Sequence, residues 1–320
     1  MRAIRFHQTG GPEVLRLDEV TRPDPGEGEV RVAVELAGVN FIDVYLRTGL
    51  YDAGGLPATA GKEGMGVVEA VGDDVDAFAP GDRVAFFDAR GAYADAVVIP
   101  ASRAIPVPAD LEPRQAAALP LQGMTAHYLI RTIEPVGAGD RVLIHAAAGG
   151  VGHLAVQFAV REGAEVFGTC STEEKAERVA SLGATAIRYD EVDFVDAVLD
   201  ATDGEGVDLA IDGVGRATFR GSVEATRTRG HVILFGQASG KPDPIQPREL
   251  LGSRTLSTAS LFDYTRTREE LLDRAAEVFS GAAEGWLHAE IDRVLPLEDA
   301  ERAHRLLENR ETSGKVLLEP

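Results

Sequence analysis

The pattern of apolar and polar residues changes along the chain, and the first third reads as β-structure. Apolar and polar positions alternate there, which is typical of half-buried strands. The strand-like runs cover residues 29–36, 66–72, 81–86 and 93–99, and Pro100 stops the last of them. Short strands at this spacing predict a partly closed, barrel-like β domain.

In the middle third, predicted strands alternate with predicted helices, which is typical of an α/β fold. Short apolar runs at 141–145, 165–169, 207–212 and 231–235 predict strands, and residues 151–162 and 172–182 predict helices between the first of them. Ser171 or Thr172 is a suitable N-cap for the second helix. Strands that alternate with helices predict a parallel sheet covered on both faces.

The last stretch, from about residue 267, predicts two helical segments and a terminal strand over 315–318. We expect the chain to end by returning to the first domain.

Composition narrows the class of protein. A chain of 320 residues with 44% hydrophobic and 26% charged residues has room for two ordinary domains. Its net charge of -20 disfavours nucleic acid and anionic membranes as partners. Cys170 is the only cysteine, so neither an intramolecular disulfide nor a thiolate zinc cluster is available. We recognise no signal peptide or membrane span, and we expect a cytoplasmic location.

The strongest local signal is the glycine-rich run 145–152, between a predicted strand and a predicted helix. In the G-x-G-x-x-G frame of dinucleotide sites, Ala147, Gly149 and Gly152 hold the three glycine positions. Alanine at the first position requires a turn that tolerates a Cβ atom. The backbone and helix N-terminus are expected to bind a pyrophosphate through Ala148, Gly149, Gly150 and Val151.

The residues after the second strand bear on the choice of nicotinamide cofactor. An NAD site places an acidic residue about 20 positions past the glycines, and this chain has Thr169, Cys170 and Ser171 there. Lys175 lies four residues past Ser171 and favours a 2′-phosphate, hence NADPH. The alternative is a surface lysine paired with an acidic neighbour. Glu173 and Glu174 lie close by and weigh against a phosphate.

Several segments together resemble one family. They are the run from Ala37 to Tyr51 (AGVNFIDVYLRTGLY), the AAAGGVG turn, Asp212–Gly215, Phe235–Gly236, and Arg302–His304. These segments resemble the zeta-crystallin-like quinone oxidoreductases, a zinc-independent group of the medium-chain dehydrogenase/reductase superfamily. The resemblance runs nearly end to end.

This resemblance implies an α/β fold with two domains. A GroES-like, β-rich catalytic domain would comprise residues 1–123 and 261–320, and a doubly wound Rossmann domain would comprise 124–260. NADPH would donate hydride to a quinone, or to an enone or alkenal in related branches, and homodimers are usual. The matching catalytic positions are Asn40, Tyr45 and Tyr51; the further cofactor positions are Thr125, Lys175, Tyr189, Phe235, Gly236 and Lys315, besides Ser171 and the turn.

Zinc enzymes of the same superfamily carry a cysteine where this chain has Asn40, and a histidine where it has Lys62 before Glu63. We therefore expect a metal-free site. Without a Lewis acid to polarise an alcohol oxygen, a quinone or enone is the suitable acceptor, because its conjugation spreads the developing negative charge.

Alternatives remain for the individual residues. Tyr45 and Tyr51 are possible hydrogen-bond donors or simple packing residues, and Asn40 is also a plausible helix cap. We interpret Lys62 as a surface residue, His145 as a structural histidine and Cys170 as a buried, inert thiol. Besides reduction of quinones and reduction of enones or alkenals, a third hypothesis for the function is a non-enzymatic, NADPH-binding role. For a homodimer, the strands near 232–235 and 255–261 are candidates for pairing across a two-fold axis.

Overall fold

A computed structural model describes residues 1–320, apart from the side chain of Glu249. The chain forms two compact units, residues 1–121 with 265–320 and residues 122–264. The limits expected from the resemblance, after residues 123 and 260, stay a prediction of where the domains divide.

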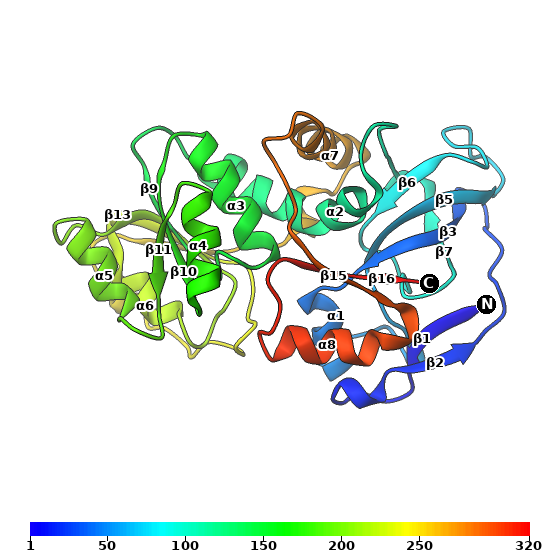
Figure 1. Cartoon of the computed structure of the whole chain (residues 1–320), viewed down its shortest axis with the longest axis horizontal. Coiled ribbons are helices and arrows are strands. Elements are labelled where there is room, and N and C mark those ends of the chain that lie inside the picture. The colour runs from blue at the N-terminus through cyan, green and yellow to red at the C-terminus, as the bar shows by residue number, and fades with distance from the viewer. The chain divides into compact units, whose positions relative to one another are not determined.

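The first unit is built on β-sheets (Figure 1). Its larger sheet has seven strands in the order β15-β16-β3-β5-β6-β8, with β7 paired to β3, and a smaller sheet has the order β2-β1-β4. The strands are β1 Arg2–Phe6, β2 Arg16–Glu19, β3 Glu29–Gly38, β4 Ala58–Thr59, β5 Glu63–Val71, β6 Arg83–Phe86, β7 Ala96–Pro100, β8 Ile105–Pro106, β15 Ile291–Pro296 and β16 Lys315–Glu319. Its helices include α1 Phe41–Thr48, α7 Arg268–Ala283 and α8 Ala300–Glu308, while α2 Pro113–Tyr128 runs from one unit into the other.

The expected return of the C-terminus is confirmed. Strand β16 pairs antiparallel with β3, with Leu317 opposite Gly38 and Leu318 opposite Ala37. The inward side chains Val316 and Leu318 join the apolar core of this unit, together with Val30, Val32 and Phe86. Because β3 ends at Gly38 and α1 begins at Phe41, this pairing brings the last residues of the chain beside the start of α1.

The second unit is a doubly wound α/β domain (Figure 1). Its six strands are parallel and ordered β11-β10-β9-β12-β13-β14. They are β9 Arg141–Ile144, β10 Glu165–Cys170, β11 Thr185–Arg188, β12 Val207–Asp212, β13 Thr226–Leu234 and β14 Thr255–Thr258, with helices α3 Gly150–Arg161, α4 Glu173–Ser181, α5 Phe194–Ala201 and α6 Phe219–Glu224. The predicted fold class, a GroES-like β domain with a Rossmann domain, is confirmed.

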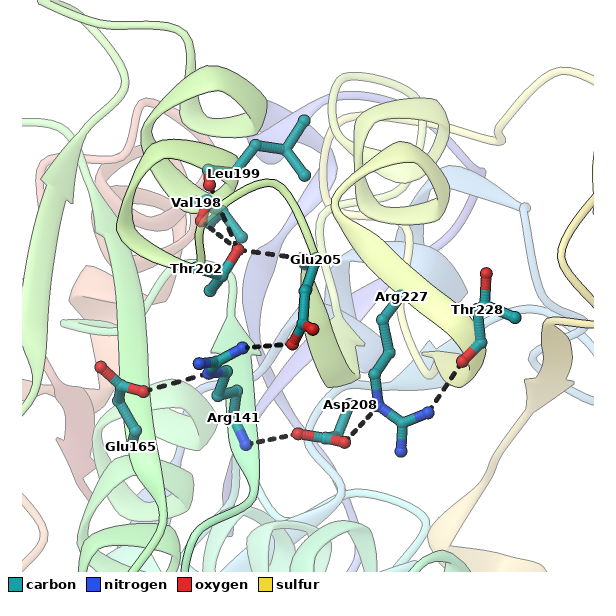
Figure 2. Close-up of polar contacts among 10 residues, drawn as sticks. Arg141, Glu165, Val198, Leu199, Thr202, Glu205, Asp208, Arg227 and Thr228 are labelled. Carbon is teal, nitrogen blue, oxygen red and sulfur yellow. Dashed lines mark hydrogen bonds and ion pairs between the residues drawn. The ribbon is translucent and has the colours of Figure 1, made fainter.

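The two edges of the parallel sheet differ in character. At the amino edge, ion pairs connect residues near the starts of neighbouring strands (Figure 2). Arg141, the first residue of β9, contacts Glu165 of β10 at 3.4 Å and Glu205 at 3.1 Å, while Arg227 of β13 pairs with Asp208 of β12. Ligands of parallel α/β sheets bind at the opposite, carboxyl edge. The candidate residues of the glycine turn, Ser171 and Phe235 all follow strand ends there.

Candidate active site and cofactor-binding loops

The glycine-rich turn joins β9 to α3 as predicted from the sequence. Gly149 is the N-cap of α3, so the backbone N–H groups of Gly150, Val151 and Gly152 form its first turn, where an α-helix supplies no acceptors. A Cβ atom on Gly152 would lie 2.3 Å from the Ala146 carbonyl oxygen, whereas one on Gly149 would come no closer than 3.1 Å to that oxygen. Gly152 is therefore needed for close packing of the helix on the turn, and Gly149 leaves the backbone approachable.

The alanine at the first glycine position fits because a neighbouring strand makes room for it. Ala147 is fully buried, and a Cβ atom on Gly168 of β10 would lie 2.7 Å from the Ala147 Cβ. The left-handed residue of the turn is Ala146, with φ of 51°. The turn therefore tolerates the side chain of Ala147 through the missing side chain of Gly168.

A buried hydrogen-bonded network joins the loops at the carboxyl edge. His145 Nε2 lies 3.0 Å from Ser222 Oγ, and Ser222 Oγ donates to Asp212 at 2.8 Å. On the other side of the ring, His145 Nδ1 lies 3.0 Å from Thr169 Oγ1, which also accepts the backbone N–H of Ala146. Because Ser222 Oγ has its acceptors in Asp212 and the Thr218 carbonyl, it accepts from the ring, so His145 donates from Nε2 and accepts at Nδ1.

This network sets the charge state of its members. Burial lowers the pKa of His145, so the imidazole is neutral. Asp212 also accepts the backbone N–H groups of Val214 and Gly215, both at 2.9 Å, and so holds the turn after β12. These contacts agree with the interpretation of His145 as a structural histidine. They connect the glycine turn to Thr169 near the end of β10 and, through Ser222, to Asp212 at the end of β12.

The loop after β13 packs on the loop after β12. The backbone N–H of Phe235 donates to the Asp212 carbonyl at 2.9 Å, and a Cβ atom on Gly236 would lie 2.7 Å from the Gly213 carbonyl oxygen. Phe235 and Gly236 therefore lie at the same sheet edge as the glycine turn. Thr125 is buried within α2, and its predicted contact with the cofactor stays a prediction.

The predicted 2′-phosphate residues surround the carboxyl ends of β10 and β11. Thr172 caps α4 and its hydroxyl accepts the backbone N–H of Lys175, so Ser171 directly precedes the cap and Lys175 lies in the first turn of that helix. Tyr189 follows β11 and is 41% exposed. Cys170 is buried, and burial raises the pKa of its thiol, which agrees with an unreactive cysteine.

In the first unit, the polar centre is Asn40 with Glu63 and Lys315. The Lys315 ammonium donates to Asn40 Oδ1 at 2.7 Å and forms an ion pair with Glu63, both side chains being fully buried. Asn40 Nδ2 donates to Glu63 at 2.9 Å and to the Gly38 carbonyl at 3.2 Å. The second Glu63 oxygen accepts the backbone N–H of Leu121 at 2.6 Å. The carboxylate thus holds an amide and an ammonium in fixed positions.

Asn40 also begins helix α1, so both interpretations of this residue have support. The Asp43 carboxylate accepts the backbone N–H of Asn40 at 2.9 Å in a capping box. Burial raises the pKa of Asp43 to about 7, although its hydrogen bonds oppose that shift. Tyr93 donates to Asp43 at 3.0 Å and lies 3.3 Å from His304 Nε2. Sequence reasoning missed this buried cluster.

The two candidate tyrosines come together on one side of α1. The rings of Tyr45 and Tyr51 are 5.2 Å apart in an edge-to-face arrangement, and the backbone N–H of Tyr51 donates to the Tyr45 carbonyl. Tyr51 is 43% exposed. Its exposure suits contact with a substrate, while the ring contact supports the packing role as well.

The residues at Asn40 do not suit a zinc ion. Zinc is held by thiolates, imidazoles and carboxylates. Here the donors are one amide and one carboxylate, and the Lys315 ammonium already occupies both of them. Within the part of the chain that the structure describes, no three His, Cys, Asp or Glu side chains are grouped to hold a metal. Lys62, in the position before Glu63, pairs with Asp88 at 2.9 Å.

Comparisons with known proteins identify relatives of this chain. Residues 150–277 match the family model "Zinc-binding dehydrogenase", and residues 26–109 match "Alcohol dehydrogenase GroES-like domain". The chain is 40% identical over 323 residues to "Quinone oxidoreductase 1" of Escherichia coli, covering 99% of each chain. It is also 40% identical over 328 residues to "2-haloacrylate reductase" of a Burkholderia species, covering 99% of this chain and 98% of the relative.

A solved structure is similar throughout. The crystal structure of Escherichia coli quinone oxidoreductase complexed with NADPH superposes with a TM-score of 0.97 at 40% identity, and all of both chains is covered. No helix among the described residues is long and apolar enough to cross a membrane.

Proposed function

The chain belongs to the quinone oxidoreductase family of the medium-chain dehydrogenases and reductases, and we propose that it reduces quinones with NADPH and without a metal ion. The observation that carries this proposal is the Asn40–Glu63–Lys315 centre. The Lys315 ammonium and the Glu63 carboxylate compensate each other's charge there, and with Asn40 they form a donor set that does not suit zinc. The similarity to quinone oxidoreductases over the whole chain supports the choice of acceptor.

The loops at the carboxyl edge of the second unit suit NADPH. The first turn of α3 offers backbone N–H groups to a pyrophosphate, and Gly149 leaves that backbone open. We assign Lys175 and Tyr189 to the 2′-phosphate, and Phe235 and Gly236 to the nicotinamide ribose. When bound, NADPH supplies the hydride from C4 of its nicotinamide ring.

Residues of the first unit would orient the acceptor and stabilise its reduced form. We assign Tyr45 and Tyr51 to contact with the quinone, where a phenol hydroxyl donates to the oxygen that gains negative charge. Asn40 acts at the start of α1 with its amide fixed by Glu63. A quinone needs little further activation, because conjugation delocalises the charge that hydride transfer creates.

A second candidate reaction is the reduction of an activated carbon–carbon double bond. The 40% identity to a 2-haloacrylate reductase, over almost all of both chains, favours it. Steady-state oxidation of NADPH with 1,2-naphthoquinone, 2-alkenals and 2-chloroacrylate separates the two reactions. A larger kcat/KM for the quinone supports our proposal, and a larger kcat/KM for the alkenes replaces it with the second reaction.

We also propose that the protein is a homodimer. Strand β14 is an outer strand of the six-stranded sheet, and among the residues that the structure describes it pairs with β13 alone, which leaves one of its edges available to a second copy. Light scattering that gives twice the 34.0 kDa of one chain supports this proposal, and a single-chain mass refutes it. The cytoplasmic location stays a prediction.

A further inference from the structure

The end of strand β11 carries a cationic residue that the sequence analysis did not single out. Arg188 is the last residue of β11, and it lies opposite Cys170 in the pairing with β10. Cys170 lies in the stretch, residues 169–171, where an NAD site carries its acidic residue. Arg188 is therefore next to the place where the 2′-phosphate of NADPH is expected.

The guanidinium of Arg188 contacts three carboxylates. It lies 2.8 Å from Glu173, 2.8 Å from Asp190 and 2.7 Å from Glu191. The contact with Asp190 holds the pKa of that carboxyl below its usual range. These carboxylates include Glu173, one of the two glutamates that weighed against a phosphate in the sequence.

The charged residues around the end of β10 also act on Cys170. Burial raises the pKa of its thiol, while Arg188 and Lys175 oppose that shift. Arg188, Glu173 and Glu191 also border an open hollow of about 400 Å³ beside β11. Arg188 and two of its three carboxylate partners therefore border space that is open to solvent.

We infer that Arg188 is a specificity-determining residue, which sets the preference for NADPH over NADH by neutralising the carboxylates around the 2′-phosphate position. A carboxylate repels a dianionic phosphate, and the repulsion falls when a cation is paired with the carboxylate. Without Arg188, the acidic side chains Glu173, Asp190 and Glu191 would face the phosphate beside a single lysine. The inference rests on the proposed use of NADPH.

The test uses ligands that lack the nicotinamide, so that it is independent of turnover. Isothermal titration calorimetry of the full chain compares adenosine 2′,5′-bisphosphate with adenosine 5′-monophosphate, which differ at the 2′ position. In Arg188→Ala, we expect the Kd of the bisphosphate to rise ~10-fold, which corresponds to about 1.4 kcal/mol. The Kd of the monophosphate should change by less than about 2-fold, because it carries no charge at that position.

Arg141 provides a matched control from the opposite edge of the same sheet (Figure 2). Its side chain is 30% exposed against 23% for Arg188, and it also pairs with more than one carboxylate. Arg141→Ala should leave the ratio of the two Kd values as it is in the unchanged chain. An equal change of both Kd values in Arg188→Ala would make Arg188 a purely structural residue and overturn the inference.

A second variant tests the mechanism of neutralisation. If Arg188 acts by balancing Glu173, then Arg188→Ala combined with Glu173→Gln should recover part of the lost affinity for the bisphosphate. No recovery would refute neutralisation of Glu173 as the cause. Failure of the unchanged protein to oxidise NADPH with any quinone would contradict the proposed function, and it would leave the ratio of Kd values as a separate result.

Discussion

Lys315 and Glu63 lie 252 positions apart in the sequence and form a fully buried ion pair beside Asn40. The pair depends on the return of β16 to β3, which brings Lys315 next to the end of β3. Breaking one partner of a buried pair leaves a charge without compensation, which costs more than losing the attraction itself.

The first prediction concerns this pair. Glu63→Gln should lower the free energy of unfolding by about 3–5 kcal/mol, because the Lys315 ammonium would remain buried with only amide acceptors. Urea unfolding followed by circular dichroism measures the change. Glu301→Gln is the control, since Glu301 forms an exposed pair with Arg305 on α8; it should cost less than about 1 kcal/mol. Equal losses in the two variants would show that the buried pair has no special role.

The second prediction concerns the network that joins the three loops. His145→Ala removes the bridge between Thr169 and Ser222, so the glycine turn loses its support and the Kd of NADPH should rise ~10-fold or more. The kcat at saturating NADPH should change much less, because both ring nitrogens of His145 contact protein hydroxyls, those of Thr169 and Ser222. Thr202→Val, at the amino edge in Figure 2, removes a buried hydroxyl from the same unit and should leave the Kd unchanged. A fall in kcat with no change in Kd would argue against this positioning role.

The third prediction compares two glycines of the turn. Gly152→Ala places a Cβ atom 2.3 Å from a backbone oxygen, so the turn or the helix must move; this should cost about 1–3 kcal/mol of stability. In Gly150→Ala the three atoms nearest to the Cβ belong to the end of the Gln122 side chain, the nearest at 2.1 Å, and a flexible side-chain end shifts at lower cost than backbone. Thermal unfolding of the two variants measures the difference. A larger loss for Gly150→Ala would contradict this account of the turn.

The fourth prediction is a pH dependence of stability that comes from Asp43. Its pKa rises from 3.8 to about 7 on folding, because burial disfavours the carboxylate. The folded state therefore binds the proton more tightly, and this group's contribution to stability falls as the pH rises from about 4 to 7. Relative to the unchanged chain, Asp43→Asn should gain stability over that range by a few kcal/mol and then level off.

The titration of His304 changes stability with pH in the opposite direction to that of Asp43. The pH dependence of the unchanged chain alone therefore does not isolate Asp43, and the comparison with Asp43→Asn is needed. Burial, with Arg47 beside it, lowers the pKa of His304 to about 3, so its contribution to stability is lost as the pH falls below 6.5. The difference between the unchanged chain and Asp43→Asn isolates the Asp43 contribution, since both contain His304. A difference that stays constant between pH 4 and 7 would show that Asp43 does not titrate there.

Local signals were sufficient to predict the nucleotide-binding unit. The glycine turn, the cap at Thr172 and the apolar runs of β9, β10 and β12 are each patterns of a few consecutive residues, so each is readable from the sequence. The sequence did not predict how the turn makes room for the Ala147 side chain, because that room comes from Gly168 in the next strand, β10.

The polar centre of the first unit was harder to predict. Asn40, Glu63 and Lys315 were each noted, but their mutual contacts join distant segments, and no periodicity encodes such contacts. The cluster of Asp43, Tyr93 and His304 was missed for the same reason. Arg188 had one local signal, its place immediately before Tyr189, whereas its three carboxylate partners appear only in the fold.

The central claim is metal-free reduction of a quinone by NADPH, and one assay tests it directly. The purified protein is dialysed against a strong chelator, its zinc content is measured, and oxidation of NADPH is followed with 1,2-naphthoquinone as the acceptor. We expect saturable turnover that is unchanged by the chelator, because the Lys315 ammonium occupies the donors of Asn40 and Glu63. Turnover that disappears with the chelator and returns with added zinc, or no quinone reduction at all, would contradict the account.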